Sequence, residues 1–173
     1  MAGVKVLSYV INHSGVTVSL VSDDYRALIE QAVSSVDRAI TLIPLDTAAG
    51  PVWPTDTQPE TVPRYVPTAE TAGLLMYTSG TTGNPKGVIL THKNLLAAGN
   101  NVVIGHDITA TDTGMCVLPI YHINGLCVTV MGTLVSASGL VMPYRFSVSG
   151  FWRQVKAYTV SYTHLRAHET FAN

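Results

Sequence analysis

The eleven residues YTSGTTGNPKG, at positions 77–87, combine three glycines, four serine or threonine hydroxyls, one proline and one lysine. Glycine allows positive φ and close approach of the backbone to a ligand, and successive amide N–H groups in such a turn bind anions. The hydroxyls add hydrogen-bond donors, and Lys86 adds a mobile positive charge. The segment is therefore suited to a phosphate group, although most clusters of these residue types after a strand are ordinary turns.

The common phosphate-binding pattern GxxxxGK[ST] does not account for this segment. Pro85 precedes the lysine and Gly87 follows it, so neither flanking requirement of that pattern is met. A P-loop nucleotide hydrolase is therefore excluded by the motif test.

Alternating strands and helices are expected on both sides of the segment. Apolar and β-branched runs predict strands, whereas capping residues and 3.6-residue periodicity predict helices. The helix expected at 147–158 should turn Phe151, Trp152 and Val155 inward. The strands are expected at 16–21, 38–43, 72–77, 88–90, 115–118 and 139–142, and the helices at 5–13, 22–33, 92–104, 123–135 and 147–158. This order predicts an α/β fold with a mostly parallel sheet and helices on both faces. Residues 44–71, with six of the nine prolines, predict a long surface loop.

Composition limits the classes of partner. A formal net charge of −1 without runs of lysine or arginine disfavours nucleic acid. Residues 113–144 carry no Asp, Glu, Lys or Arg, and 123–142 is long enough to span a bilayer, but its polar residues favour a buried soluble core instead. No secretory signal is visible, so a cytoplasmic location is expected, and Cys116 and Cys127 are expected to be free and buried.

The full string closely resembles the phosphate-binding signature TSGTTGxPKG of the adenylate-forming (AMP-binding) superfamily, and all nine fixed positions match. Downstream, LPIYHIN at 118–124 resembles the next motif of that superfamily, an aromatic–histidine pair that borders the acyl pocket. Without the resemblance, His122 is better explained as a core histidine. Residues 7–25 also resemble the segment that precedes this region, so the likeness covers about residues 7–158.

The resemblance implies roles for particular residues. Enzymes of this superfamily join a carboxylate to ATP, and the ligase branch then transfers the acyl group to coenzyme A. Lys86 and His122 are the implied catalytic residues, and Thr78 is the implied contact to Mg²⁺. The implied nucleotide-binding residues are Thr78, Ser79, Gly80, Thr81, Thr82, Gly83 and Lys86, and the implied substrate-binding residues are Tyr121, His122 and Asn124.

The branch most similar to this chain is that of the coenzyme A ligases for fatty or other small carboxylic acids, on the segments LPIYHING and FSVSGFWRQV. Residues 1–158 then correspond to part of the large N-terminal domain, and this chain alone is expected to be inactive because the adenine, ribose and C-terminal motifs are not found. The alternative is a nucleotide-binding module without catalysis. Residues 159–173, which become polar, are expected to be a foreign or disordered tail, and His164 and His168 at i, i+4 spacing are a weak metal-ligand set.

Overall fold

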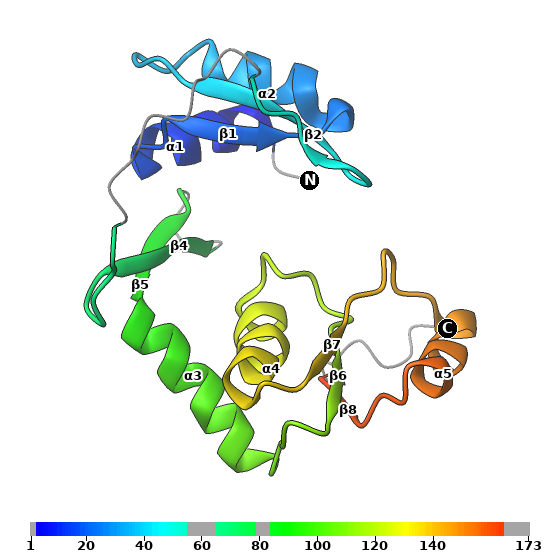
Figure 1. Ribbon diagram of the computed structural model, residues 1–173. Helices are drawn as coiled ribbons and strands as arrows, with labels where there is room; N and C mark the ends of the chain where they lie inside the picture. Colours follow the sequence, from blue (N-terminus) through cyan, green and yellow to red (C-terminus); the bar gives the residue numbers. More distant parts are fainter. Residues whose placement is uncertain (1–2, 55–64, 79–83, 165–173) are drawn as a thin grey trace. The chain divides into compact units, whose positions relative to one another are not determined.

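The computed structural model describes residues 3–54, 65–78 and 84–164 (Figure 1). The described residues form two compact units, one within 1–66 and 75–89 and the other within 67–74 and 90–173. The helices are α1 (Val4–Ser14), α2 (Arg26–Val33), α3 (His92–Gly105), α4 (Met131–Ser136) and α5 (Val148–Ala157), with the short helix η1 (Asp23–Tyr25) and the π-helix η2 (Asn124–Val130). The strands are β1 (Val18–Val21), β2 (Thr41–Asp46), β3 (Gly50–Pro51), β4 (Ala72–Thr78), β5 (Lys86–Thr91), β6 (Thr113–Met115), β7 (Gly139–Val141) and β8 (Tyr162–Thr163).

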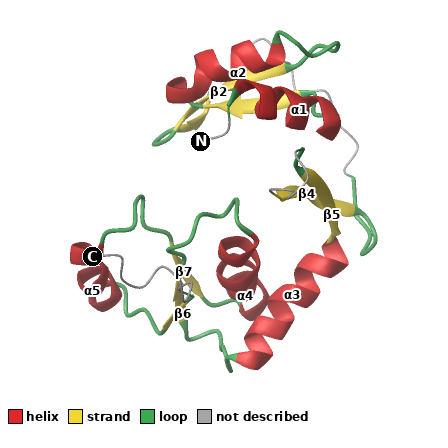
Figure 2. Ribbon diagram, turned by 180° about the vertical axis from the view of Figure 1, so that it is seen from behind, coloured by secondary structure: helices red, strands yellow, loops and turns green. Residues whose placement is uncertain are grey.

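The first unit is built on a β–α–β arrangement. β1 pairs in parallel with β2, from Val18 opposite Thr41 to Val21 opposite Pro44. α1 and α2 lie side by side on one face of this pair, as the two opposite views show (Figures 1 and 2). The buried apolar residues of this layer are Ile11, Val21, Ala32 and Ile43.

A single arginine ties the end of α1 to the loop before β2. The Arg38 guanidinium donates to the carbonyl oxygens of Ile11, Asn12 and Val16, the last at 2.9 Å from Nε. Gly15 ends the helix in the left-handed region, with φ 68°, where the absence of a Cβ removes the steric penalty. The last carbonyls of α1, which lack the backbone donors of a continuing helix turn, therefore accept from a charged side chain.

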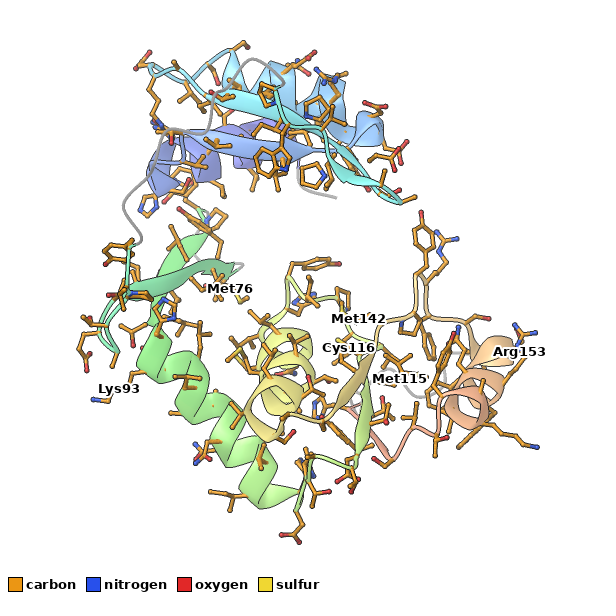
Figure 3. All side chains as sticks on the ribbon, in the orientation of Figure 1. Met76, Lys93, Met115, Cys116, Met142 and Arg153 are labelled. Atoms are coloured by element: carbon orange, nitrogen blue, oxygen red, sulfur yellow. The ribbon has the colours of Figure 1, made fainter. Side chains whose placement is uncertain are left out.

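The second unit contains a parallel three-stranded sheet of order β7-β6-β8. α4 and α5 lie on opposite sides of this sheet (Figures 1 and 2). Gly99 of α3 allows a close approach to α4, because an added Cβ would lie 2.6 Å from the carbonyl oxygen of Met131. Met115 and Cys116, labelled in Figure 3, are buried at the sheet.

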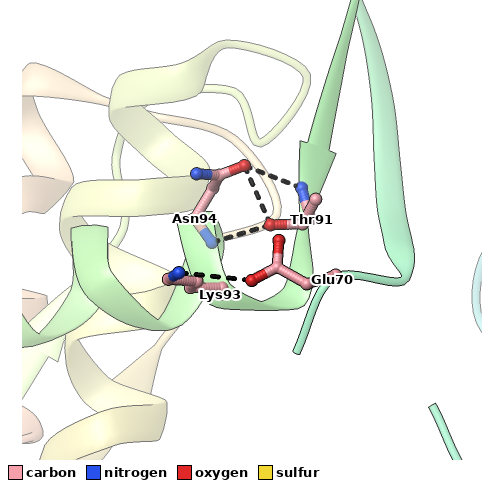
Figure 4. A network of polar contacts seen from close by, with 4 residues as sticks. All are labelled: Glu70, Thr91, Lys93 and Asn94. Atoms are coloured by element: carbon pink, nitrogen blue, oxygen red, sulfur yellow. Dashed lines mark hydrogen bonds and ion pairs between the residues drawn. The ribbon is translucent and has the colours of Figure 1, made fainter. Parts of the chain in front are cut away.

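α3 begins with a reciprocal cap. The Thr91 hydroxyl accepts from the Asn94 backbone N–H at 3.2 Å, and the Asn94 side chain accepts from the Thr91 N–H at 3.0 Å (Figure 4). Beside it, Lys93 and Glu70 form an ion pair at 3.2 Å (Figure 4). The arrangement of Thr91 and Asn94 is a capping box, with an asparagine in place of the usual Glu or Gln partner.

The predicted α/β class and the parallel pairing are confirmed, and the strands are divided among three small sheets. Trp152 does not turn inward as predicted: its side chain is 75% exposed, because it lies on the outer face of α5. Tyr162 and Thr163, within the segment expected to be a tail, form β8 against β6. His168 lies outside the described residues.

Candidate functional site

The first group of predicted site residues lies where β4 ends and β5 begins. Thr78 is the last residue of β4 and Lys86 the first of β5, and these strands form a two-stranded sheet. The Thr78 hydroxyl lies 3.5 Å from the Lys86 carbonyl oxygen, to which it donates. Both side chains are exposed, so the hydroxyl and the ammonium group are available to a ligand. The other predicted nucleotide-binding residues, Ser79, Gly80, Thr81, Thr82 and Gly83, lie outside the described residues.

Tyr77, one position before Thr78, is held from the side by α1. Its hydroxyl lies 2.7 Å from Nδ1 of His13, and the two rings meet edge to face with centroids 5.7 Å apart. Burial, and then the proximity of Tyr9, raise the pKa of Tyr77 above its ordinary value, so the phenol stays protonated at neutral pH. Motif comparison missed His13, although the i, i+4 spacing of Tyr9 and His13 on a predicted helix was a signal that the two rings share a face.

The second group, Tyr121, His122 and Asn124, lies in the second unit between β6 and the start of η2. The Tyr121 and His122 rings are in contact, with centroids 4.8 Å apart. Tyr121 is 72% exposed and His122 is also exposed, whereas Asn124 is half-buried at the first turn of η2. The interpretation of His122 as a core histidine is therefore wrong.

The buried Cys116 thiol contacts the backbone on either side of Tyr121, His122 and Asn124. The Cys116 thiol donates to the carbonyl oxygen of Leu118 at 3.3 Å and lies 3.6 Å from that of Gly125. At Gly125, an added Cβ would lie 2.6 Å from the carbonyl oxygen of Pro119, so the start of η2 packs directly on the preceding loop. The His122 N–H donates to the Pro119 carbonyl at 3.0 Å, which closes the turn that presents the histidine.

Burial raises the pKa of the Cys116 thiol, although bonds with the Thr129 side chain and the Leu118 backbone oppose the shift. Burial also raises the pKa of Cys127. Both thiols are free and buried, as the sequence predicts, and a protonated buried thiol acts as a small apolar group and weak donor. Neither is suited to nucleophilic chemistry.

The π-helical geometry of η2 was not predicted. A π-turn widens the helix by one residue per turn and is frequent at functional sites. Here Gly125, Cys127 and Thr129 are buried while Ile123, just before the helix, remains exposed. η2 therefore begins beside the loop that carries Tyr121 and His122.

Thr78 and Lys86 belong to the first unit, and Tyr121, His122 and Asn124 to the second. Within the described ranges no three His, Cys, Asp or Glu side chains gather in a way that would hold a metal ion. Over the same ranges, no helix has both the length and the hydropathy to cross a membrane.

Comparison with known proteins gives curated relatives that are named as coenzyme A ligases. A sulfoacetate–CoA ligase of Cupriavidus necator is 40% identical over 149 residues, which are 85% of this chain and 29% of that protein. A crotonobetaine/carnitine–CoA ligase of Salmonella paratyphi A is 36% identical over 101 residues, which are 57% of this chain and 20% of that protein. This chain therefore spans less than a third of these relatives.

Solved structures share the fold. Mycobacterium smegmatis MbtA superposes with a TM-score of 0.80 at 23% identity, covering 95% of this chain and 32% of that one. The N-terminal domain of FACL13 from Mycobacterium tuberculosis gives a TM-score of 0.72 at 21% identity, covering 94% of this chain and 40% of that one. The family described as AMP-binding enzyme matches residues 3–166, past the predicted boundary at 158. This chain belongs to the AMP-binding enzyme family.

Proposed function

We propose that this chain forms part of an ATP-dependent carboxylate–CoA ligase, which joins a carboxylic acid to ATP as an acyl-adenylate and then transfers the acyl group to coenzyme A. The observation that carries the proposal is the complete nine-position phosphate-binding string, whose two flanks form the paired strands β4 and β5. The coenzyme A ligases among the relatives support the branch. A cytoplasmic location, where ATP and coenzyme A are available, is part of the proposal.

In this proposal Lys86 binds the β- and γ-phosphates of ATP. Its side chain is exposed at the first position of β5, and its backbone is held by the Thr78 hydroxyl. An ammonium group at this position stabilises the charge that grows on the departing pyrophosphate, which is the main contribution a protein makes to such transfers. Ser79, Gly80, Thr81, Thr82 and Gly83 are proposed to add backbone and hydroxyl donors.

A contact to magnesium is proposed at the same place. Hard cations that accompany nucleotide phosphates prefer oxygen ligands, and the Thr78 hydroxyl is an exposed oxygen beside Lys86. When bound, the ion would neutralise phosphate charge. Thr78 is the residue of this chain proposed to contact it.

Tyr121, His122 and Asn124 are proposed to bind the carboxylic acid. The exposed ring pair at Tyr121 and His122 offers an apolar surface together with an imidazole that can donate to a carboxylate. The relatives named for sulfoacetate and for crotonobetaine or carnitine support a small polar acid. The expectation of a role in fatty acid metabolism stays a prediction.

The experiment uses the full-length natural protein that carries this sequence, together with its Lys86→Ala variant. Pyrophosphate release is measured with ATP, magnesium and a panel of carboxylic acids, and Mg-ATP binding is measured by calorimetry. Loss of charge-assisted hydrogen bonds worth about 1.5–3 kcal/mol predicts adenylate formation roughly ten- to a hundredfold slower in the variant. Lys93→Ala, which removes an exposed lysine paired with Glu70, is the matched control and should change neither measurement.

Absence of pyrophosphate release with every acid would exclude the ligase function. Equal rates for the wild type and Lys86→Ala would exclude the proposed role of the lysine. The 173-residue chain gives the test of the alternative, a nucleotide-binding module without catalysis. That alternative predicts Mg-ATP binding that Lys86→Ala weakens, with no pyrophosphate formed.

A further inference from the structure

A contact between α1 and β4 fixes the residue that precedes Thr78. His13, in the last turn of α1, lies with Nδ1 2.7 Å from the Tyr77 hydroxyl. Either atom can donate, according to the imidazole tautomer. Tyr9, one turn earlier, stacks on His13 with ring centroids 5.4 Å apart and an angle of 26° between the planes. The three rings therefore form a continuous row from the helix to the strand.

The same rings also contact the residue that follows Lys86. A Cβ added to Gly87 would lie 3.4 Å from Cε1 of His13 and 3.4 Å from Cε1 of Tyr77. It would lie 3.0 Å from Cδ1 of Leu75, closer than nearly all real Cβ contacts. The backbone of β5 thus lies directly against the side chains that β4 and α1 supply.

The helix that carries His13 is well anchored. Arg38 binds the carbonyl oxygens that end α1, and the Ser8 hydroxyl donates to the Ala32 carbonyl of α2 at 2.8 Å. A hydrogen bond to a residue on an anchored helix restricts Tyr77 more than a bond to a freely moving side chain would. Forming the bond also costs less conformational entropy, because the helix is already ordered. Tyr77 is therefore held by a fixed group.

We propose that His13 and Tyr77 are positioning residues, which set the end of β4 and the start of β5 so that Thr78 and Lys86 are correctly placed for the phosphates of ATP. This inference rests on the proposed function of those two residues. In this proposal neither His13 nor Tyr77 binds the nucleotide directly. They act through the chain neighbours Thr78 and Lys86 and through the packing of Gly87.

The test compares Tyr77→Phe and His13→Ala in the full-length natural protein, because each removes the hydrogen bond and the first leaves the ring in place. The KM for Mg-ATP and its calorimetric Kd should rise about fivefold, while the KM for the acid changes less than twofold. The double variant should be no weaker than the worse single variant, because both changes remove one interaction. His13→Asn, whose side-chain amide can reach the place of Nδ1, should restore most of the affinity.

Tyr9→Phe is the matched control. It also removes a tyrosine hydroxyl from the row of rings, but not the one bonded to His13. The KM for Mg-ATP and the KM for the acid should both stay unchanged. Equal rises in the KM for ATP and for the acid, together with a lower Tm, would show a merely structural role and overturn the inference. Unchanged ATP affinity in Tyr77→Phe, or single effects that multiply in the double variant, would overturn it as well.

Failure of the proposed function is distinguishable from failure of this inference. A wild-type protein that binds Mg-ATP but releases no pyrophosphate excludes the ligase, and the Kd values still test the positioning role. An active wild type with insensitive variants excludes only the positioning role.

Discussion

Gly125 is the residue at which the geometry leaves least room for change. A methyl group there would lie 2.6 Å from the Pro119 carbonyl oxygen and 2.8 Å from that of Leu118, and both obstacles are backbone atoms. Gly125→Ala is therefore expected to destabilise the protein by about 1–3 kcal/mol, as overpacking does in a dense core. The loop must move to relieve the clash, so the KM for the acid should rise more than the KM for ATP. Chemical denaturation and substrate-specific kinetics measure the two effects.

Gly105→Ala is the matched control for that prediction. Gly105 is the last residue of α3, and an added Cβ would meet nothing within 4 Å. Alanine in a helix at an open position is neutral or stabilising by up to about 1 kcal/mol. Similar losses in both variants would contradict the role given to the contact between Gly125 and Pro119.

The two thiols give a prediction about pH. Because burial raises the pKa of Cys116 and Cys127 in the folded state, the folded protein holds these protons more tightly than the unfolded chain does. Their contribution to stability is present below the ordinary thiol value of 9.0 and is lost as pH rises through the raised folded values. Alkylation by iodoacetamide at pH 8 should be slow in the native protein and fast in urea, as mass spectrometry would show. Equal rates in the two states would contradict the burial of the thiols.

At the scale of the element, Arg38 holds α1 to the loop before β2. The guanidinium serves three carbonyl oxygens and the Asn12 side chain at once, which a lysine cannot reproduce because its ammonium group lacks the planar fork. Arg38→Lys is expected to lower the free energy of unfolding by about 1–2 kcal/mol, and Arg38→Ala by about 2–3 kcal/mol, since the carbonyl oxygens of Ile11, Asn12 and Val16 lose a charged donor. Urea denaturation followed by circular dichroism measures both values.

Arg26→Ala provides the comparison for an arginine on the surface. Arg26 lies 3.2 Å from Glu30 and 3.9 Å from Asp23, and all three side chains are substantially exposed. Such pairs contribute about 0–1 kcal/mol. If Arg26→Ala lowered the free energy of unfolding as much as Arg38→Ala does, the contacts of Arg38 with the end of α1 would not explain the destabilisation.

At the scale of the whole molecule, the elements could be predicted from local chemistry. The cap at Thr91, the glycine after Ser14 and the apolar runs each determine a boundary from neighbouring residues alone. Parallel pairing follows from the alternation of strands and helices, because a crossover helix brings the next strand back in the same direction. The α/β class therefore needed no information on long-range contacts.

Long-range packing determined what the sequence could not predict. The π-helical turns at 124–130 begin where Gly125 packs against Pro119, and no local pattern encodes that contact. Trp152 has the periodicity of an inward residue, yet the face of α5 that is buried depends on its sheet. Tyr162 and Thr163 follow a polar segment, but pairing with Gly114 and Met115 makes them a strand.

The candidate site also contains residues that local sequence identifies and residues that only long-range contacts reveal. Lys86 and His122 could be identified because they lie within contiguous motifs, whose spacing is visible in the sequence. His13 lies 64 positions from its partner Tyr77, and Cys116 is separated from Gly125 by the whole intervening motif, so only the folded chain shows these contacts. Residues proposed to bind a ligand are thus easier to recognise in the sequence than residues proposed to position them.

The burial of both native thiols has a practical consequence for spectroscopy. A cysteine introduced at Ile120, a residue that is 48% exposed in the loop before His122, would be the one exposed thiol in the described part of the chain, which a maleimide dye reaches quickly. Neither native cysteine would have to be replaced first. Fluorescence from that single label would then follow the arrival of an acid in a chain whose interior is left untouched.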